Sequence, residues 1–284
     1  MTIKVIGLGE GGAKSVGKMI AADIGAGKAV EFICVGTDEN ILLVSNARKN
    51  IFLNRDMTTL YQNFSEALSE ADLIFIVGGL GSNAARLAVP IITSCARSFG
   101  AVTVAFVCRP FVLESVVRKI NADHTLKNLR GKVDTLFDVP AEKFFALRIN
   151  QPEISLSELF DVADEIFCRG VKIFLDILSD VDDPMFCRWG NAAFGCGSGK
   201  TALEAIKAAA SFPTLNADDI AEADGVFVSL VGKKSLPLQA VDAANNFVKG
   251  RMKSDAEFFT REAVDAAQTD KVFAALICTR TDNR

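Results

Sequence analysis

The stretch Val5-Ile-Gly-Leu-Gly-Glu-Gly-Gly-Ala-Lys-Ser15 decides the fold. It follows a short apolar run and leads into residues with helical spacing, so it predicts a strand, a tight glycine turn and a helix. Glycines let the backbone approach a ligand closely, and the helix N-terminus offers unpaired N–H groups to phosphate. Gly7, Gly9 and Gly12 also match the GxGxxG pattern of dinucleotide-binding turns, with Asp38 just past the second predicted strand. The stretch predicts a phosphate cradle and leaves a nicotinamide enzyme as one alternative.

Strand and helix patterns alternate outward from this turn. The predicted strands are 3–6, 32–35, 51–53, 73–77, 102–107 and 133–139, and the predicted helices between them are 13–24, 40–44, 59–68, 84–99 and 113–129. Repeated units of this kind predict an α/β fold with a Rossmann-like, doubly wound parallel sheet.

The second half begins with a long helical pattern, from about Ser155 to Leu178. At 1.5 Å per residue this helix would be roughly 36 Å long, the width of a domain. Further strands (194–197, 225–230, 256–260, 272–279) and helices (202–210, 238–248) follow it. We therefore expect a nucleotide-binding domain at 1–152, a central helix and loop at 153–180, and a smaller α/β domain at 181–284.

Charge and composition argue against several classes of function. There are 31 Lys and Arg residues against 35 Asp and Glu, so the basic excess of a nucleic-acid-binding protein is missing. The longest apolar runs are about eight residues, too short for the roughly twenty of a membrane span. Seven cysteines without a CxxC pair, and a single histidine, do not suit a zinc site. We expect a cytoplasmic protein with reduced thiols and no metal centre of its own.

A second glycine run, Gly195-Cys-Gly-Ser-Gly-Lys-Thr201, resembles a P-loop. Phe194 would take the place of the first glycine in that pattern, and a bulky side chain there conflicts with a loop that surrounds phosphate. We expect a turn that leads into the next helix.

Taken together, several segments resemble the FtsZ/tubulin family, on the FtsZ side. They include KVIGLGEGGAKSVGKMI, FICVGTDENILLVSNA, EADLIFIVGGLGSNAARLAVPII, AVTVAFVCRPFVLE, VDTLFDVPAEKFF, SELFDVADEIFCRGVKIFLDIL, GNAAFGCGSGKTALEAIKAA and DGVFVSLVG, in the family's order over nearly the whole chain. The resemblance implies a guanine-nucleotide domain, a central helix and a second α/β domain. It also implies head-to-tail stacking, in which the next subunit caps the nucleotide and its carboxylates position the attacking water.

The resemblance implies a set of nucleotide-binding residues. Glu114 and Arg118 match contacts to ribose and base, Phe160 matches an aromatic near guanine, and Asp164 matches the acceptor for the guanine edge. The phosphate side would be formed by Gly9, Gly11, Gly12, Asp38, Gly81 and Ser82. Without the resemblance, Phe160 fits core packing equally well, and Glu114 and Arg118 fit an ordinary pair on a helix face.

The phosphate side departs from the family pattern. Glu10 replaces a glycine and brings a negative charge that Lys14 could offset. Of the family's GGGTGTG loop only Gly81 remains, and we expect side chains to narrow the space there, namely those of Asn83, Ala84, Ala85 and Leu87. Ser82 and Asn83 remain able to cap the next helix, Arg86 fits a surface charge, and Ala141 replaces an asparagine that contacts the base.

The catalytic loop departs most. Where the family has NxDxxD, this chain has the shorter Ser179-Asp-Val-Asp-Asp-Pro184. Asp180, Asp182 and Asp183 are candidate water-orienting groups, and the alternative is a short acidic turn that ends the helix. A general base needs hydrogen-bond reach of the water, which we expect a shortened loop to miss.

We therefore expect a cytoplasmic FtsZ-like protein that binds GTP or GDP, with Mg²⁺ as a candidate ion, and stacks into filaments with weak or absent hydrolysis. The alternatives are a scaffold that stacks without nucleotide, an active GTPase of cell division or membrane remodelling, and a nicotinamide oxidoreductase. The family often ends in a tail that docks membrane adaptors. This sequence stops at Arg284, so a membrane link would require an unknown partner.

Overall fold

The chain forms two compact units, Met1–Arg188 and Trp189–Arg284, in the computed structural model. The structure describes residues 1–54, 56–146, 155–181, 183–266 and 268–280. Each unit has its own set of neighbouring strands and its own hydrophobic core. Within the described residues, no helix is both long and apolar enough to cross a bilayer.

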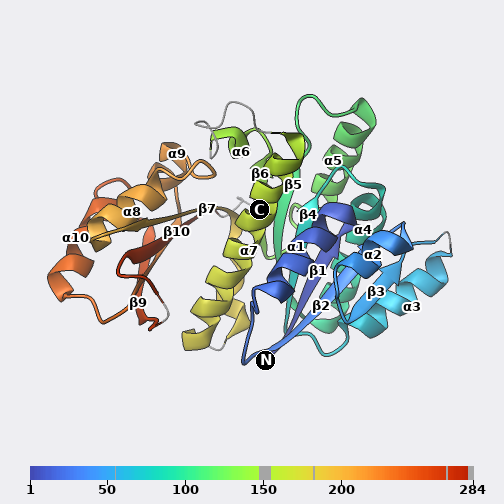
Figure 1. The fold of residues 1–284 in the computed structure, drawn as a ribbon, viewed down its shortest axis with the longest axis horizontal. Coiled ribbons are helices and arrows are strands. Elements are labelled where there is room, and N and C mark those ends of the chain that lie inside the picture. The colour runs from blue at the N-terminus through green and yellow to red at the C-terminus, as the bar shows by residue number, and fades with distance from the viewer. Residues whose placement is uncertain (55, 147–154, 182, 267, 281–284) are drawn as a thin grey trace. The chain divides into compact units, whose positions relative to one another are not determined.

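The first unit is built on a parallel sheet (Figure 1). Its strands are β1 (Thr2–Leu8), β2 (Ala29–Gly36), β3 (Lys49–Phe52), β4 (Leu73–Gly79), β5 (Val102–Arg109) and β6 (Thr135–Pro140). They lie in the order β3-β2-β1-β4-β5-β6, and every neighbouring pair is parallel. The predicted doubly wound, Rossmann-like sheet is confirmed, because chain order reverses between β1 and β4.

Helices cover both faces of this sheet. One face packs on α3 (Met57–Leu68), α4 (Asn83–Phe99) and α5 (Val116–Leu129). Figure 1 shows α1 (Gly9–Ala21) and α7 (Leu156–Val181) on the other face. The short helices α2 (Glu39–Val44) and α6 (Lys143–Ala146) complete the unit, with a 3-10 turn at Pro184–Cys187. Strand residues alternate between these two layers, as buried parallel strands require.

The central helix α7 runs for 26 residues, as its apolar spacing predicts. It packs on the sheet through Phe174, which meets Phe75, Phe106 and Phe137 edge-on at centroid distances of 6.0, 5.6 and 5.7 Å. Gly170 makes this close approach possible, because a Cβ there would lie 2.5 Å from the ring of Phe106.

The second unit has the strand order β7-β10-β8-β9, formed by β7 (Gly190–Gly199), β8 (Gly225–Gly232), β9 (Glu257–Val264) and β10 (Val272–Arg280). β10 is antiparallel to β7 and β8, and β9 pairs in parallel with β8. Its helices are α8 (Ala202–Ala210), α9 (Ala217–Ala221) and α10 (Leu238–Lys249). Trp189, the chain's single tryptophan, stacks on Phe227 with ring centroids 6.1 Å apart.

The second glycine run does not form a P-loop. Gly195, Gly197 and Gly199 lie on one face of strand β7, so the turn expected there is confined to the two residues before α8. A Cβ on Gly195 would lie 2.1 Å from the carbonyl oxygen of Ala209 in α8, and one on Gly197 would lie 2.5 Å from the Ala208 Cβ. The glycines therefore serve close contact between a strand and a helix.

Candidate functional site

Two loops meet at the carboxyl ends of β1 and β4, where the strand order reverses. Gly9 has φ +65°, and a Cβ on it would lie 3.0 Å from Ser82 Oγ. A Cβ on Gly7 would lie 2.4 Å from the Gly12 carbonyl oxygen. The glycines thus allow the start of α1 to lie directly against the strand and the facing loop. Ligands of open α/β sheets bind at this kind of switch point.

A cavity of about 310 Å³ opens between these loops and α7. Its volume lies within the usual range of small-molecule sites. One part is apolar and aromatic, formed by Leu8, Pro110, Phe111, Ala141, Phe144, Phe160, Ala163 and Phe167. The other part is polar and includes Glu10, Gly11, Lys14, Ser82, Glu114 and Arg118. The carboxylate of Asp164 also lines the cavity, from the same helix as the apolar Phe160, Ala163 and Phe167. Cys108 also lines the cavity, but burial raises the pKa of its thiol to about 12, so it stays neutral at physiological pH.

A second hollow of about 300 Å³ adjoins the cavity. The two share Glu10, Gly81, Ser82 and Arg118, and the second hollow adds Gly9, Gly36, Thr37, Asp38, Asn83, Ala84, Val117 and Asn121. The first residue of α1 is Gly9, and no side chain caps this end of the helix. Its N–H groups therefore remain available to an anion.

The charge of Glu10 is offset as the sequence predicts. Lys14 Nζ lies 2.9 Å from Glu10 Oε1, and the pair is more than half exposed. The hydrogen bond to Glu10 is the main cause that raises the pKa of the Lys14 amine. The negative charges of Asp164 and Asp161 raise this pKa further. Lys14 therefore remains a cation at the cavity wall.

The aromatic side of the cavity includes the predicted Phe160, which is 38% exposed. Its ring meets Phe111 edge-on, at a centroid distance of 5.8 Å. Glu114 lies in the turn before α5, accepts a hydrogen bond from the backbone N–H of Phe111 at 2.8 Å, and forms an ion pair with Arg118. Glu114 and Arg118 thus pair with each other, as the simpler interpretation expects, and both also line the cavity.

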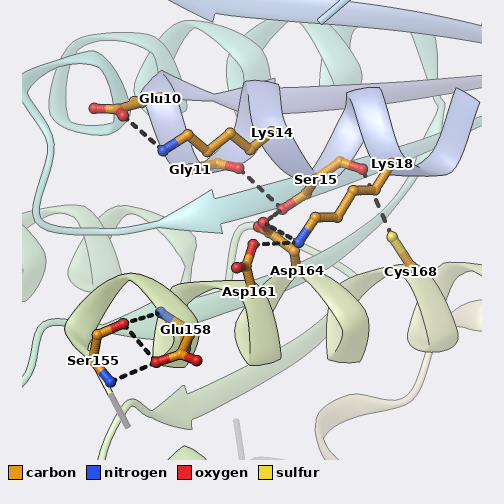
Figure 2. Close-up of polar contacts among 10 residues, drawn as sticks. All are labelled: Glu10, Gly11, Lys14, Ser15, Lys18, Ser155, Glu158, Asp161, Asp164 and Cys168. Carbon is orange, nitrogen blue, oxygen red and sulfur yellow. Dashed lines mark hydrogen bonds and ion pairs between the residues drawn. The ribbon is translucent and has the colours of Figure 1, made fainter. Parts of the chain in front are cut away.

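Asp164 joins α7 to α1 (Figure 2). It is 4% exposed. Ser15 Oγ donates to its Oδ1 at 2.5 Å, and Lys18 Nζ lies 3.1 Å from its Oδ2 and 2.6 Å from Asp161 Oδ1. Burial raises the pKa of the Asp164 carboxyl above its usual 3.8, and the hydrogen bonds from Ser15 and Lys18 offset this only in part.

We expected four side chains after β4 to narrow the space for phosphates, and only two of them lie where they could do so. Ser82 caps α4, since its Oγ accepts from the N–H of Ala85 at 3.0 Å. Asn83 and Ala84 line the second hollow. Ala85 belongs to the hydrophobic core and Leu87 packs against it. Neither lines either cavity, so the expectation that these two narrow the phosphate space is wrong. Because a helix turns once in about 3.6 residues, neighbouring residues point in different directions, and these two point away from the site.

Two of the three predicted acidic residues, Asp180 and Asp183, are described by the structure and lie at the C-terminal end of α7. Asp180 is in the last turn of α7, about 24 Å along the helix from Asp164 at 1.5 Å per residue. Asp183 caps the 3-10 turn and accepts from the N–H of Met185 at 2.9 Å. Asp182 lies outside the described residues. Asp183 lines neither cavity, and no group of three potential metal ligands occurs within the described residues.

The remaining candidates are placed at the same switch point. Gly11 lines the cavity, and a Cβ there would meet nothing within 4 Å. Gly12 is buried, and a Cβ at this position would lie 2.8 Å from the carbonyl oxygen of Val77. Asp38 lines the second hollow and caps α2 by accepting from the N–H of Asn40 at 2.9 Å.

Sequence reasoning missed several residues of this region, notably Ser15, Lys18, Phe111 and Asn121. Asn121 is 8% exposed, and its amide donates to Asn83 Oδ1 at 3.2 Å. The sequence contained one indication that Ser15 and Lys18 lie near the site. They follow the predicted site residue Gly11 by four and seven residues, so all three share one face of the helix.

The solved structures most similar to this chain include FtsZ and CetZ proteins. No protein-family model matches the chain. An empty FtsZ dimer from M. jannaschii is similar over 100% of this chain and 89% of that one, with 26% identity and a TM-score of 0.84. A W319Y mutant of FtsZ from M. jannaschii gives the same identity and TM-score, over 99% and 91% of the two chains. The protofilament of CetZ2 from Haloferax volcanii bound to GTPgS shares the fold, with 19% identity over 100% and 95% and a TM-score of 0.78.

Proposed function

Because this chain is a divergent FtsZ-like protein, we propose that it binds a guanine nucleotide at the switch point and stacks head to tail into filaments. The observation that carries the nucleotide proposal is the continuous pair of cavities. An apolar, aromatic part with one buried carboxylate adjoins a polar part at the uncapped start of α1.

The aromatic part suits a purine base. Phe160 and Phe111 offer ring faces and edges to a planar base. Asp164 offers carboxylate oxygens, which only accept when ionised, to the adjacent N1–H and N2–H₂ donors of guanine. Arg118 lines both cavities, and its ion-pair partner Glu114 lines the first, so we assign these two residues to the ribose.

The polar part suits the phosphates. The N–H groups at the start of α1 and the cation of Lys14 favour negative charge there. Asp38 is the carboxylate available to a Mg²⁺ ion, which usually binds through substrate phosphates and one or two carboxylates. Guanine nucleotides fit the residues present, and Mg²⁺ would enter with the phosphates.

We expect weak or absent hydrolysis. Asp180 and Asp183 stand at the far end of α7 from this subunit's cavity, so they would act only on the nucleotide of a neighbouring subunit. The carboxylate of Asp183 already caps a turn. Phosphate release that rises steeply with protein concentration would contradict this part of the proposal.

An exposed apolar surface supports stacking. Five aliphatic side chains around the start of α5 are 62 to 94% exposed, and we call them the apolar collar: Val112, Leu113, Val116, Val117 and Ile120. The cavity-lining Glu114 and Arg118 lie among them in sequence. Contiguous exposed apolar surface of this kind marks interaction sites. We propose that a second copy covers the collar and the cavity mouth together, in a cytoplasmic filament.

A nucleotide-independent scaffold is the second candidate. The contacts of Asp164 favour this candidate. Both of its carboxylate oxygens already have partners on α1, Ser15 and Lys18, so the side chain has a structural role that does not require a base. Identification of the nucleotide released on denaturing the purified protein separates the two. Guanine nucleotide supports our proposal, NAD overturns it, and a clean absence with no binding of added GTP favours the scaffold.

The base site is tested by calorimetric titration of GDP into the wild type and Asp164→Ala. Loss of a hydrogen bond to a charged group costs about 1.5–3 kcal/mol, so we expect affinity to fall about 10- to 100-fold. Asp176→Ala is the matched control, because Asp176 is on the same helix and pairs with Lys172 outside the cavity. Equal affinities of the wild type and Asp164→Ala would show that Asp164 does not read the base.

A further inference from the structure

We propose that Ser15 is a positioning residue for base recognition: its hydroxyl holds the Asp164 carboxylate toward the cavity and so sets the preference for guanine over adenine. The inference rests on the proposed nucleotide site and adds a determinant of its selectivity. Ser15 is completely buried and does not itself line the cavity. Any effect it has on a ligand must therefore pass through its neighbours.

The first argument is the geometry of the hydroxyl (Figure 2). Ser15 Oγ lies 2.5 Å from Asp164 Oδ1 and 3.0 Å from the carbonyl oxygen of Gly11, one turn earlier in α1. A hydroxyl has one hydrogen, so it donates fully to only one of these acceptors. The much shorter distance and the negative charge both favour Asp164, since hydrogen bonds to an ionised acceptor are the stronger ones. The Gly11 carbonyl is the weaker alternative.

The second argument compares Ser15 with Lys18, the other partner of Asp164. Lys18 is shared between Asp164 and Asp161, and its side chain is 40% exposed. The Asp161 side chain is 56% exposed, so this pair competes with water. The bond from Ser15 is buried and serves Asp164 alone among the carboxylates. We therefore assign the orientation of Asp164 mainly to Ser15.

The third argument is the acceptor capacity that remains. A carboxylate has about four lone-pair positions, and Ser15 and Lys18 occupy two of them. The others can serve two donors from the cavity, which Asp164 lines. Guanine offers N1–H and N2–H₂ side by side. Adenine has an acceptor at N1, which an ionised carboxylate repels.

Removal of the hydroxyl would weaken this discrimination. The buried carboxylate would lose a donor that stabilises its charged form, because the bond from Ser15 lowers the pKa of Asp164 against the effect of burial. A freed carboxyl can turn away from the cavity. A protonated one can donate to N1 of adenine. Both changes reduce the preference for guanine.

The experiment measures the Kd of GDP and of ADP for the full chain, for Ser15→Ala, for Asp164→Ala and for the double variant. We expect Ser15→Ala to reduce the GDP-to-ADP preference about tenfold, the effect of about 1.4 kcal/mol. The double variant should show the same preference as Asp164→Ala alone, since Ser15 acts through Asp164. If Ser15 only supported the fold, Ser15→Ala would lower the affinities for GDP and ADP alike. The double variant would then bind both nucleotides more weakly than Asp164→Ala does.

Two further variants control for packing. Thr93→Val deletes a buried hydroxyl in α4 that bonds to its own helix at Val89, and it should leave the preference unchanged. Ser15→Cys keeps the shape of the side chain but replaces the hydroxyl by a larger thiol, which is only a weak donor. This variant should therefore also lose the preference for GDP, and it serves as the test if Ser15→Ala does not fold. Wild-type GDP preference that persists in both Ser15 variants would overturn this inference alone. Wild-type protein that binds neither nucleotide would overturn the proposed function and this inference with it.

Discussion

At the scale of single residues, the carboxyl of Asp164 is the most informative group in the molecule. It is buried, it lines the cavity, and its two oxygens contact the helix that starts the proposed phosphate site. Burial raises its pKa above 3.8, so protonation begins at a higher pH than for an exposed aspartate. Because the folded-state pKa lies above the unfolded one, ionisation of this group costs stability at neutral pH. That cost disappears as the pH falls through the folded-state pKa.

This shift predicts a pH dependence of guanine binding. The ionised carboxylate is the acceptor, so GDP affinity should fall as the pH is lowered toward the raised pKa of Asp164. Groups that influence its charge are Lys18, Ser15 and Asp161, with Cys108 and Cys168 nearby. In Asp164→Asn the affinity should be lower at neutral pH and flat over the same range. Titrations at several pH values check this, and a wild-type profile as flat as that of Asp164→Asn would contradict it.

Sequence alone predicted Asp164 and Phe160 as site residues but not the partners of Asp164. Ser15 and Asp164 are 149 residues apart, and no local pattern indicates which residue of one helix will face which residue of another. Pairing depends on how α1 and α7 pack, which follows from side-chain fit at their interface. Phe111 was missed for a related reason, because its role depends on the position of Phe160 across the cavity.

At the scale of elements, strands and helices were largely predictable because apolar periodicity reflects burial directly. Every predicted helix and strand of the first unit is present, with ends displaced by a few residues. The short helices α6 and α9 and the 3-10 turn at Pro184–Cys187 were missed, since one turn is too short to show periodicity. Phe194 was enough to argue against a P-loop, and the structure gives the reason for the glycines beside it: they allow β7 to pack closely on α8.

The glycine in the middle of α7 gives a prediction for stability. Gly170→Ala should destabilise the protein although alanine is the better helix former by about 1 kcal/mol. The new methyl would lie 2.5 Å from the Phe106 ring, which stacks on Phe137 at 4.4 Å and cannot easily move. Overpacking of this kind costs about 1–3 kcal/mol.

The matched control is Gly17→Ala in α1. Its Cβ would come no closer than 3.5 Å to Ser45, an ordinary contact. We expect this variant to gain about 0.5–1 kcal/mol from helix propensity. Urea unfolding of both variants measures the difference. A Gly170→Ala protein as stable as Gly17→Ala would mean that the Phe106 cluster is loosely packed.

At the scale of the whole molecule, the apolar collar makes assembly testable without reference to hydrolysis. Leu113 is 94% exposed, so Leu113→Asp should leave the fold intact. A charge at the centre of a contact that excludes water is costly, and assembly measured by sedimentation should fall about tenfold or more. Phe99→Asp is the control, because Phe99 is also exposed and ends α4 where the parallel strands begin, opposite the carboxyl ends at which the cavity lies. Equal assembly of wild type and Leu113→Asp would exclude the collar as the contact surface.

The stacking of Trp189 on Phe227 has a practical consequence for all these measurements. Both rings belong to the second unit, and the chain has no other tryptophan. Its single tyrosine, Tyr61, lies in α3 of the first unit. Indole emission therefore originates in the second unit, and tyrosine emission, which lies at a shorter wavelength, originates in the first. An experimenter can follow the melting of each half of the wild-type molecule by its own optical signal, without attaching a dye.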